Sequence, residues 1–474
     1  MQSKTAEAIE DHALEAVPLD QRHSWVPMAW NSTGAVTTLV QLFVGAITCF
    51  VAGIQLALTA GLVATAIGTT IGWACGHIAY KTGLSSTVMS RQYGFGRPGS
   101  AFFSAIFAFV IIGFLALENA LLFKGVLFFA QVPETWPVRI GAYGIMTIAW
   151  ITLTAFGFKL VSRASSVIMT LFLLILAWML WKVVGMNSAS PLDLLTFPTQ
   201  FPSDFLAKLG VTDTASKFFF CINTVMGGAG ALALFSADQS RYARSSKDSA
   251  IASLLGSIAL CVIIVAVGGL IMYAGMPALV KYYATTGGLS EAAAHKTALQ
   301  SPDSIAAAFV IIGGGLGTLL MVLANSKVQV VNTYVASLSL TNLFDVVNCR
   351  ISRLACVVIA NVLGLIMLSG DILERVAGLL NVFAVATTAL AAVMIADYYF
   401  VGRFLPLDAR PDRMNWAGVI SAAIAVSLAH WPLAKLFPLE FATTFVITVI
   451  VYPILRFWAF RPAASRREVS VWNS

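Results

Sequence analysis

Apolar residues fill long stretches of this chain, with few charges between them. Runs of about 18 or more predominantly apolar residues recur from one end to the other, and a run of that length predicts a helix that crosses a lipid bilayer. The chain lacks the strictly alternating segments that are typical of strands in an outer-membrane barrel. The pattern therefore predicts an all-α integral membrane protein embedded in a lipid bilayer.

About twelve stretches qualify as transmembrane helices. They cover residues 28–53, 55–80, 100–130, 137–157, 164–186, 215–236, 250–275, 304–326, 354–370, 374–396, 415–435 and 438–459. We expect one membrane domain over residues 28–460, between an N-terminal tail (1–27) and a C-terminal tail (461–474). The first tail has no basic segment followed by a short apolar core, so it does not predict a cleavable signal peptide.

Composition and charge placement agree with this interpretation. Of 474 residues, 58% are hydrophobic and only 11% are charged, whereas a soluble domain averages about 25% charged residues. The net charge of +7 comes from arginines and lysines that gather in the connectors after alternate predicted spans and at the end of the chain. By the positive-inside rule, these connectors and both termini are expected to be cytoplasmic, in an inner (plasma) membrane. The basic excess thus indicates topology and not nucleic-acid binding.

Cysteine and histidine spacing offers no metal site. The six cysteines fall mostly within predicted spans, no CxxC pair occurs, and the five histidines form no HExxH motif. Nothing resembles a nucleophile–base pair at a sensible spacing. We therefore expect no metal, no cofactor other than a possible coupling ion (Na+ or H+), and no enzymatic activity.

Glycines cluster on two predicted spans that lie five spans apart. The first span carries Gly34 and Gly45, and the sixth carries MGGAGALAL (226–234), which includes Gly227 and Gly228. Broken helices at matching places in two halves of a transporter often mark its binding site. Close helix packing is the alternative role for these glycines.

Glu118 lies well inside the third predicted span. A charge at the bilayer centre costs about 3 kcal/mol on insertion scales, so this carboxyl needs a partner, a cavity or a proton. Phe114 stands one helical turn earlier on the same face, and the two side chains would make half of a pocket for a flat ligand. The alternative is a buried glutamate that ties its span to a neighbour.

The eighth predicted span carries a stripe of amides. Asn325, Gln329 and Asn332 follow the spacing of one helical face, and amides both donate and accept hydrogen bonds, as the edge of a heterocycle requires. Contacts between helices are the alternative role. Lys327 stands among them, either as a buried cation or as a side chain that extends to the cytoplasmic surface.

Four stretches resemble the nucleobase–cation symporter-1 family, which includes cytosine permease and the hydantoin and allantoin transporters. They are AVPLDQRHSW before the first span, AYKTGLSSTVMSRQYGFGRPGS after the second, SADQSRYARSSKDS after the sixth and IADYYFVGR after the tenth. The resemblance covers about residues 16–460, and the connector after the second span is its most specific part.

The resemblance implies a LeuT-like fold that works by alternating access. Two inverted five-helix repeats, at about 28–186 and 215–396, would be followed by two extra helices at about 415–459. The resemblance also implies roles for individual residues. Phe114 falls where cytosine permease has a tryptophan that stacks on the base. Asn325 and Gln329 fall near the family's polar pair on the eighth span. The other candidates are the 226–234 segment for backbone contacts to substrate, Gly34 and Thr38 for carbonyls near sodium, and Thr38 and Gln41 as substrate contacts.

Two departures from the family concern the ligand and the ion. The sixth span offers Leu232 or Met226 where an aromatic residue would complete a sandwich around the base. The eighth span offers Ser326 as the sole hydroxyl near the sodium position, with Lys327 beside it. We therefore hypothesise that Lys327 takes the place of sodium and that coupling is to protons or absent, with Glu118 as the acid.

These observations predict a monomeric secondary transporter that imports a nucleobase or a related planar nitrogen compound. A carrier of a non-aromatic amide or amine is the first alternative, because the second aromatic residue is missing from the predicted site. A membrane sensor that binds a ligand without transporting it is the second, although the short tails do not favour it.

Overall fold

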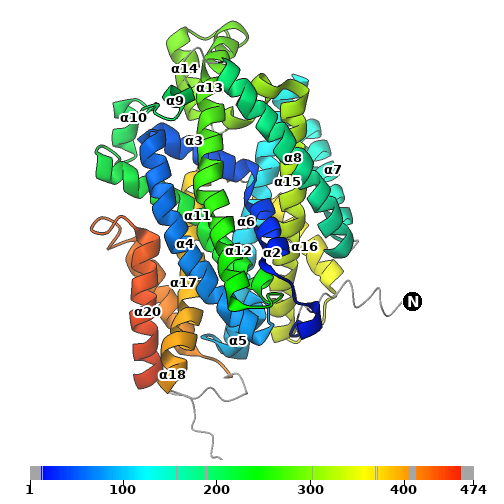
Figure 1. Ribbon diagram of the computed structural model, residues 1–474, viewed down its shortest axis with the longest axis vertical. Coiled ribbons are helices and arrows are strands. Elements are labelled where there is room, and N and C mark those ends of the chain that lie inside the picture. Colours follow the sequence, from blue (N-terminus) through cyan, green and yellow to red (C-terminus); the bar gives the residue numbers. More distant parts are fainter. Residues whose placement is uncertain are drawn as a thin grey trace, which may run out of the picture.

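The computed structural model describes residue 12 and residues 14–155, 158–186, 191–301, 303–368, 370, 372–404 and 413–460, and these residues are largely helical (Figure 1). The long helices are α2 (Trp25–Val36), α3 (Leu39–Ala52), α4 (Ile54–Thr82), α6 (Gly96–Ala130), α7 (Trp136–Ala155), α8 (Phe158–Met186), α11 (Thr214–Ser240), α12 (Ser246–Ile258), α13 (Ile264–Thr285), α15 (Ser304–Val346), α16 (Arg353–Leu368), α17 (Val376–Ala396), α19 (Trp416–His430) and α20 (Glu440–Trp458). The short ones are η1 (Leu19–Gln21), α5 (Ser86–Gln92), α9 (Pro191–Leu194), α10 (Ser203–Lys208), η2 (Ala259–Ile263), α14 (Glu291–Gln300), η3 (Ile372–Arg375), η4 (Asp397–Val401) and α18 (Gly402–Phe404).

Each of the twelve predicted spans coincides with a helix or a helix pair. In the described ranges, eight helices are long and apolar enough to cross a membrane, and the bent pair α2–α3 makes a ninth. α16 and α19 are shorter apolar helices, so the number of twelve crossings stays a prediction. Figure 1 shows α9, α10 and α14 at one end of the bundle and α5 and α18 at the other. The predicted C-terminal tail (461–474) and residues 1–11 and 13 of the N-terminal tail lie outside the described residues.

The first span is broken in the middle. α2 ends at Val36, α3 begins at Leu39, and the two helix axes differ in direction by 66°. Thr37 and Thr38 form the break, and Thr38 has extended backbone angles. Because the break lies at mid-span, both cut helix ends expose backbone groups that need partners inside the protein.

The sixth span is not broken, contrary to the possibility that its glycines unwind it. α11 continues as one helix from Thr214 to Ser240 through the whole glycine segment. A Cβ atom on Gly227 would lie 2.7 Å from the Leu380 carbonyl oxygen, and one on Gly230 would lie 2.4 Å from Oγ1 of Thr387. These glycines therefore bring α11 close to α17, which is the packing role that the sequence left as the alternative.

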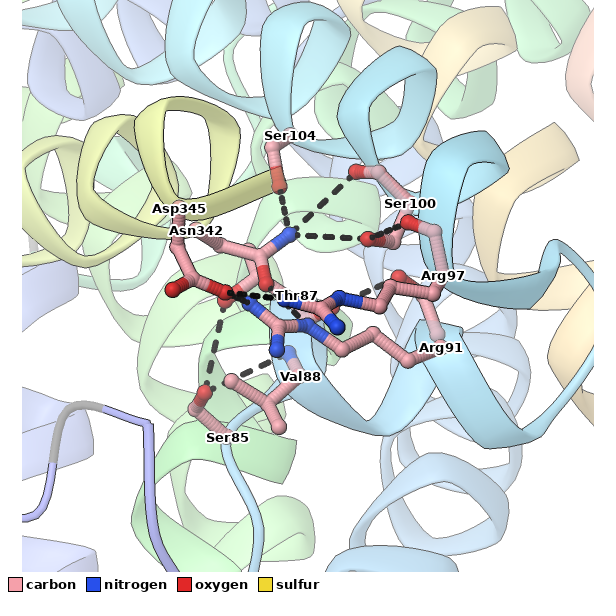
Figure 2. A network of polar contacts seen from close by, with 10 residues as sticks. Ser85, Thr87, Val88, Arg91, Arg97, Ser100, Ser104, Asn342 and Asp345 are labelled. Carbon is pink, nitrogen blue, oxygen red and sulfur yellow. Dashed lines mark hydrogen bonds and ion pairs between the residues drawn. The ribbon is translucent and has the colours of Figure 1, made fainter. Parts of the chain in front are cut away.

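The connector after α4 is held at three points. Its Ser86 amide donates to Asp238 of α11 at 2.6 Å, and its Gly94 amide donates to Asp397 at 2.8 Å. Between them, Arg91 of α5 donates to Asn342 at 2.6 Å and pairs with Asp345 at 2.7 Å, both on α15 (Figure 2). The stretch that most resembles the symporter family is thus a joint between three helices.

The segment ahead of α2 is paired with the connector between α11 and α12. The His23 amide donates to the Tyr242 carbonyl at 2.6 Å, and the Arg244 amide donates to the His23 carbonyl at 2.9 Å. The Trp25 amide donates to Asp248 at 2.9 Å, and Arg22 donates to the Tyr80 carbonyl at 2.8 Å. We call residues 17–25 the strap. It attaches the start of α2 to the same end of the bundle as α5.

Candidate functional site

A partly open cavity lies beside the break in the first span, and the empty space in it and at its opening is about 510 Å³. Its walls come from α2, the break, α3, α6, α11, the π-helical turn η2 and α15. The polar lining residues are Thr38, Gln41, Glu118 and Asn332, and the remaining lining is apolar. Small-molecule sites commonly combine apolar walls with a few polar groups in this way.

Glu118 lines this cavity and also binds the amino end of α3. Its Oε2 accepts a hydrogen bond from the Leu39 amide and its Oε1 one from the Val40 amide, each at 3.1 Å. A helix amino end carries a partial positive charge, so a carboxylate there is stabilised by both charge and hydrogen bonds. Both roles considered for Glu118, cavity wall and tie between spans, therefore describe its position.

Lys327 binds the other side of the same break. Its Nζ donates to the Thr37 carbonyl oxygen at 3.1 Å and to the Thr37 hydroxyl, and it lies 4.3 Å from the centre of the Phe172 ring. The side chain is 1% exposed, so it does not extend to the surface. An ammonium at the carboxyl end of α2 meets the negative end of that helix dipole.

Each of the two buried charges thus stabilises one of the two helix ends at the break. Glu118 comes from α6 and Lys327 from α15, and the part of the break that each contacts has the opposite partial charge. Gly34 lies beside this lysine, and a Cβ atom there would lie at an ordinary contact distance, 3.7 Å from Cδ of Lys327. Ser326 donates to the Val322 carbonyl of its own helix at 2.7 Å, not to the break.

The predicted amide stripe divides into two roles. Asn325 donates to the Glu118 backbone carbonyl at 2.7 Å, and Gln329 donates to the Leu115 carbonyl at 2.8 Å and to Asn119 at 2.7 Å. These bonds hold α15 against α6, and neither residue is among those that line the cavity. Asn332, one turn further along, does line it. The contacts of Asn325 and Gln329 match the interhelical alternative.

Two aromatic residues line the cavity, and the sequence analysis identified one of them. Phe114 stands on α6 and packs on Phe383 of α17, with ring centres 5.1 Å apart. Phe235 of α11 is the second, and Leu232 lines the cavity as well, whereas Met226 is not among the lining residues. Phe235 follows the glycine segment directly, so extending the search by one residue beyond 226–234 would have found it.

The remaining candidates lie at the α3–α11 contact. Gly228 lines the cavity, and a Cβ atom there would lie 2.7 Å from Nε2 of Gln41. Gln41 lines the cavity too, and its side-chain amide forms no hydrogen bond within the described part of the chain. Gly227 faces α17 instead. The described residues include no group of three or more His, Cys, Asp or Glu side chains placed to hold a metal ion.

A broken membrane span with a cavity beside the break is typical of secondary transporters. The chain belongs to the family of permeases for cytosine/purines, uracil, thiamine and allantoin, whose sequence model matches residues 23–408. The predicted family is thereby confirmed, and its members are membrane transporters, not enzymes. No curated protein sequence matches the chain.

Solved transporters share the fold. The inward-facing conformation of Mhp1 is 17% identical, with a TM-score of 0.67 and 92% of each chain covered. Mhp1, a nucleobase-cation-symport-1 family transporter, in a closed conformation with bromovinylhydantoin bound is 15% identical, with a TM-score of 0.67 over 95% of this chain and 97% of that one. A Na+-coupled sialic acid symporter is 12% identical, with a TM-score of 0.59 over 96% and 92%. The predicted LeuT-like fold is confirmed.

Proposed function

We propose that this permease imports a small planar nitrogen compound, such as a nucleobase or a hydantoin, by alternating access. The main support for this proposal is the lining of the cavity. Phe114 and Phe235 provide aromatic surface there. The hydrogen-bonding groups come from Glu118, Gln41 and Asn332. A flat heterocycle has an apolar face and a polar edge, so it matches such a lining. The family model and the Mhp1 structures are consistent with this substrate class.

The proposal extends to the coupling ion. Lys327 holds its ammonium on the Thr37 carbonyl at the break, where the family resemblance implies sodium. A tethered cation at that position leaves no need for a sodium ion, so transport is coupled to protons or uncoupled. Glu118, the one acid among the described residues of the cavity wall, is the proposed proton-binding partner.

Location and assembly belong to the same proposal. The carrier is a monomer in an inner membrane, and the end of the bundle that holds α5 and the strap faces the cytoplasm. The basic residues of that end, such as Arg91, Arg97 and Arg244, support this orientation by the positive-inside rule.

One observation favours a second candidate, a carrier of an amine or amide without an aromatic ring. Glu118 is the only charged residue on a largely apolar wall, which suits an ammonium group. The presence of Phe235 weakens this candidate, because α11 does contribute an aromatic residue to the cavity lining, although at another position than Leu232.

A thermal-shift screen of the purified protein tests both candidates. Nucleobases, hydantoins, ureides and aliphatic amines would be compared with sodium or choline as the cation, at two pH values. A ligand that binds the native state raises the unfolding temperature by mass action. We expect a planar base or hydantoin to stabilise the protein to the same extent in sodium and in choline, with a dependence on pH. Stabilisation by aliphatic amines alone would contradict the proposed substrate class.

A further inference from the structure

The amino end of α3 has no free backbone donor left. The four amides that an α-helix cannot pair internally are here those of the capping residue Thr38 and of residues 39–41. Thr38 donates to the Val36 carbonyl at 3.0 Å, Leu39 and Val40 donate to Glu118, and Gln41 donates to Oγ1 of Thr38 at 3.2 Å. In carriers with discontinuous helices, such an end commonly points at an anionic group of the substrate. Here a side chain of the protein already occupies it.

The described part of the cavity wall also lacks a positive charge. Glu118 is the only charged residue among the described residues that line it. The nearby cation, Lys327, is not a lining residue, because its ammonium is held by Thr37 and faces the Phe172 ring. A ligand in the cavity therefore meets a carboxylate without meeting a counter-ion at the wall.

We infer that Glu118 is a resident substitute for a substrate carboxylate and that it selects substrates by charge. The inference rests on the proposed function and sharpens its substrate class. Neutral or cationic compounds with an N–H group can donate to Glu118, because a carboxylate offers about four acceptor positions and the Leu39 and Val40 amides and the Thr38 hydroxyl use three of them. Anionic compounds are excluded, because they repel Glu118 and find the helix end occupied.

The first test needs no knowledge of the substrate. Glu118→Ala removes the carboxylate and leaves the Leu39 and Val40 amides without an acceptor, so a small carboxylate should bind in its place. We expect sodium formate to raise the unfolding temperature of full-length E118A, whereas the bulky anion of sodium gluconate should not. Wild type and the control variant Asn119→Ala should show no such difference, because the Asn119 side chain bonds Trp150 and Gln329 and not α3. Equal formate shifts in all three proteins would overturn the inference.

The second test uses ligand pairs that differ by one carboxylate. Uracil is compared with orotate, and hydantoin with hydantoin-5-acetic acid, on wild type and on Glu118→Gln, which keeps the side-chain volume if E118A does not fold. We expect the acid of each pair to bind wild type at least about tenfold more weakly than its neutral partner. This difference in affinity should be smaller in E118Q. Equal affinities within each pair on wild type would overturn the inference. Formate stabilisation of E118A without any heterocycle binding would instead reject the proposed function and leave the charge selection standing.

Discussion

Two side chains from different helices neutralise the two ends of the break in the first span. Buried charges are costly in a membrane, and each one here is matched by an oppositely charged helix end and by hydrogen bonds to backbone groups. Glu118 accepts hydrogen bonds from two amides of α3, and Lys327 donates to the carbonyl of Thr37, which caps the carboxyl end of α2. The break and the charges therefore stabilise each other.

Replacing Lys327 should allow sodium to bind at the break. Lys327→Thr removes the ammonium from the Thr37 carbonyl and adds a hydroxyl on α15, so sodium should then raise the unfolding temperature of the variant more than choline does. Wild type should respond equally to both salts. Lys124→Thr is the control, because that ammonium pairs with Glu134 at 2.6 Å in a part-exposed position. A wild type that responds to sodium, or a variant that does not, would contradict the proposed replacement.

Sequence reasoning located the charged residues of the site but not their partners. Hydropathy alone marks Glu118 and Lys327 as buried charges that need an explanation. Both side chains bind backbone groups of residues 37–40, far away in the sequence, and a backbone group carries no residue-type signal. Asn325 and Asn332 look equivalent on one helical stripe, and only the position of α6 decides which of them faces the cavity.

α11 illustrates how one pattern supports two structures. Glycine weakens a helix and also permits close approach, so the 226–234 segment is compatible with unwinding and with packing. What decides between them is the neighbour: the Leu380 carbonyl and the Thr387 hydroxyl of α17 lie where side chains on α11 would otherwise be. Since α11 stays helical, its backbone is satisfied internally and it faces the cavity with side chains such as Phe235.

Adding a single methyl group to α11 tests this packing. Gly227→Ala places a carbon 2.7 Å from the Leu380 carbonyl oxygen, which is part of a helix and cannot rotate away. We expect a loss of about 1–3 kcal/mol in the free energy of unfolding. Gly144→Ala on α7 is the matched control, since nothing lies within 4 Å of its added carbon, and it should be neutral or stabilising by up to about 1 kcal/mol. Equal effects of the two changes in denaturation measurements would argue against close α11–α17 packing.

At the scale of the molecule, one end of the bundle collects the polar joints. The strap, the α5 connector and the far end of α15 meet there through Arg22, Arg91 and Asp345 (Figures 1 and 2). The positions of the apolar helices were predictable, because they follow from local composition, whereas the sidedness of the basic connectors stays a prediction. The joints themselves were not predictable, because they pair residues that are distant in the sequence.

A single exposed cysteine allows the orientation to be measured. Cys349 follows α15 near Asp345 and is exposed, whereas the other five cysteines are buried. We expect a membrane-impermeant maleimide to label the protein in inverted membrane vesicles and not in right-side-out spheroplasts, and Cys349→Ser to abolish the labelling. Labelling of wild type in spheroplasts would place this end on the external side and contradict the proposed orientation.

The strap also provides an optical reporter. The rings of His23 and Tyr242 are stacked, with centres 5.9 Å apart and planes inclined by 7°. One ring belongs to the segment that leads into α2, and the other belongs to the connector behind α11. A movement of α2 away from α11 at this end would therefore separate the rings. A fluorophore at position 23 would change its emission when the rings separate. Opening of the end of the bundle that holds the strap can therefore be timed in single molecules without a labelled substrate.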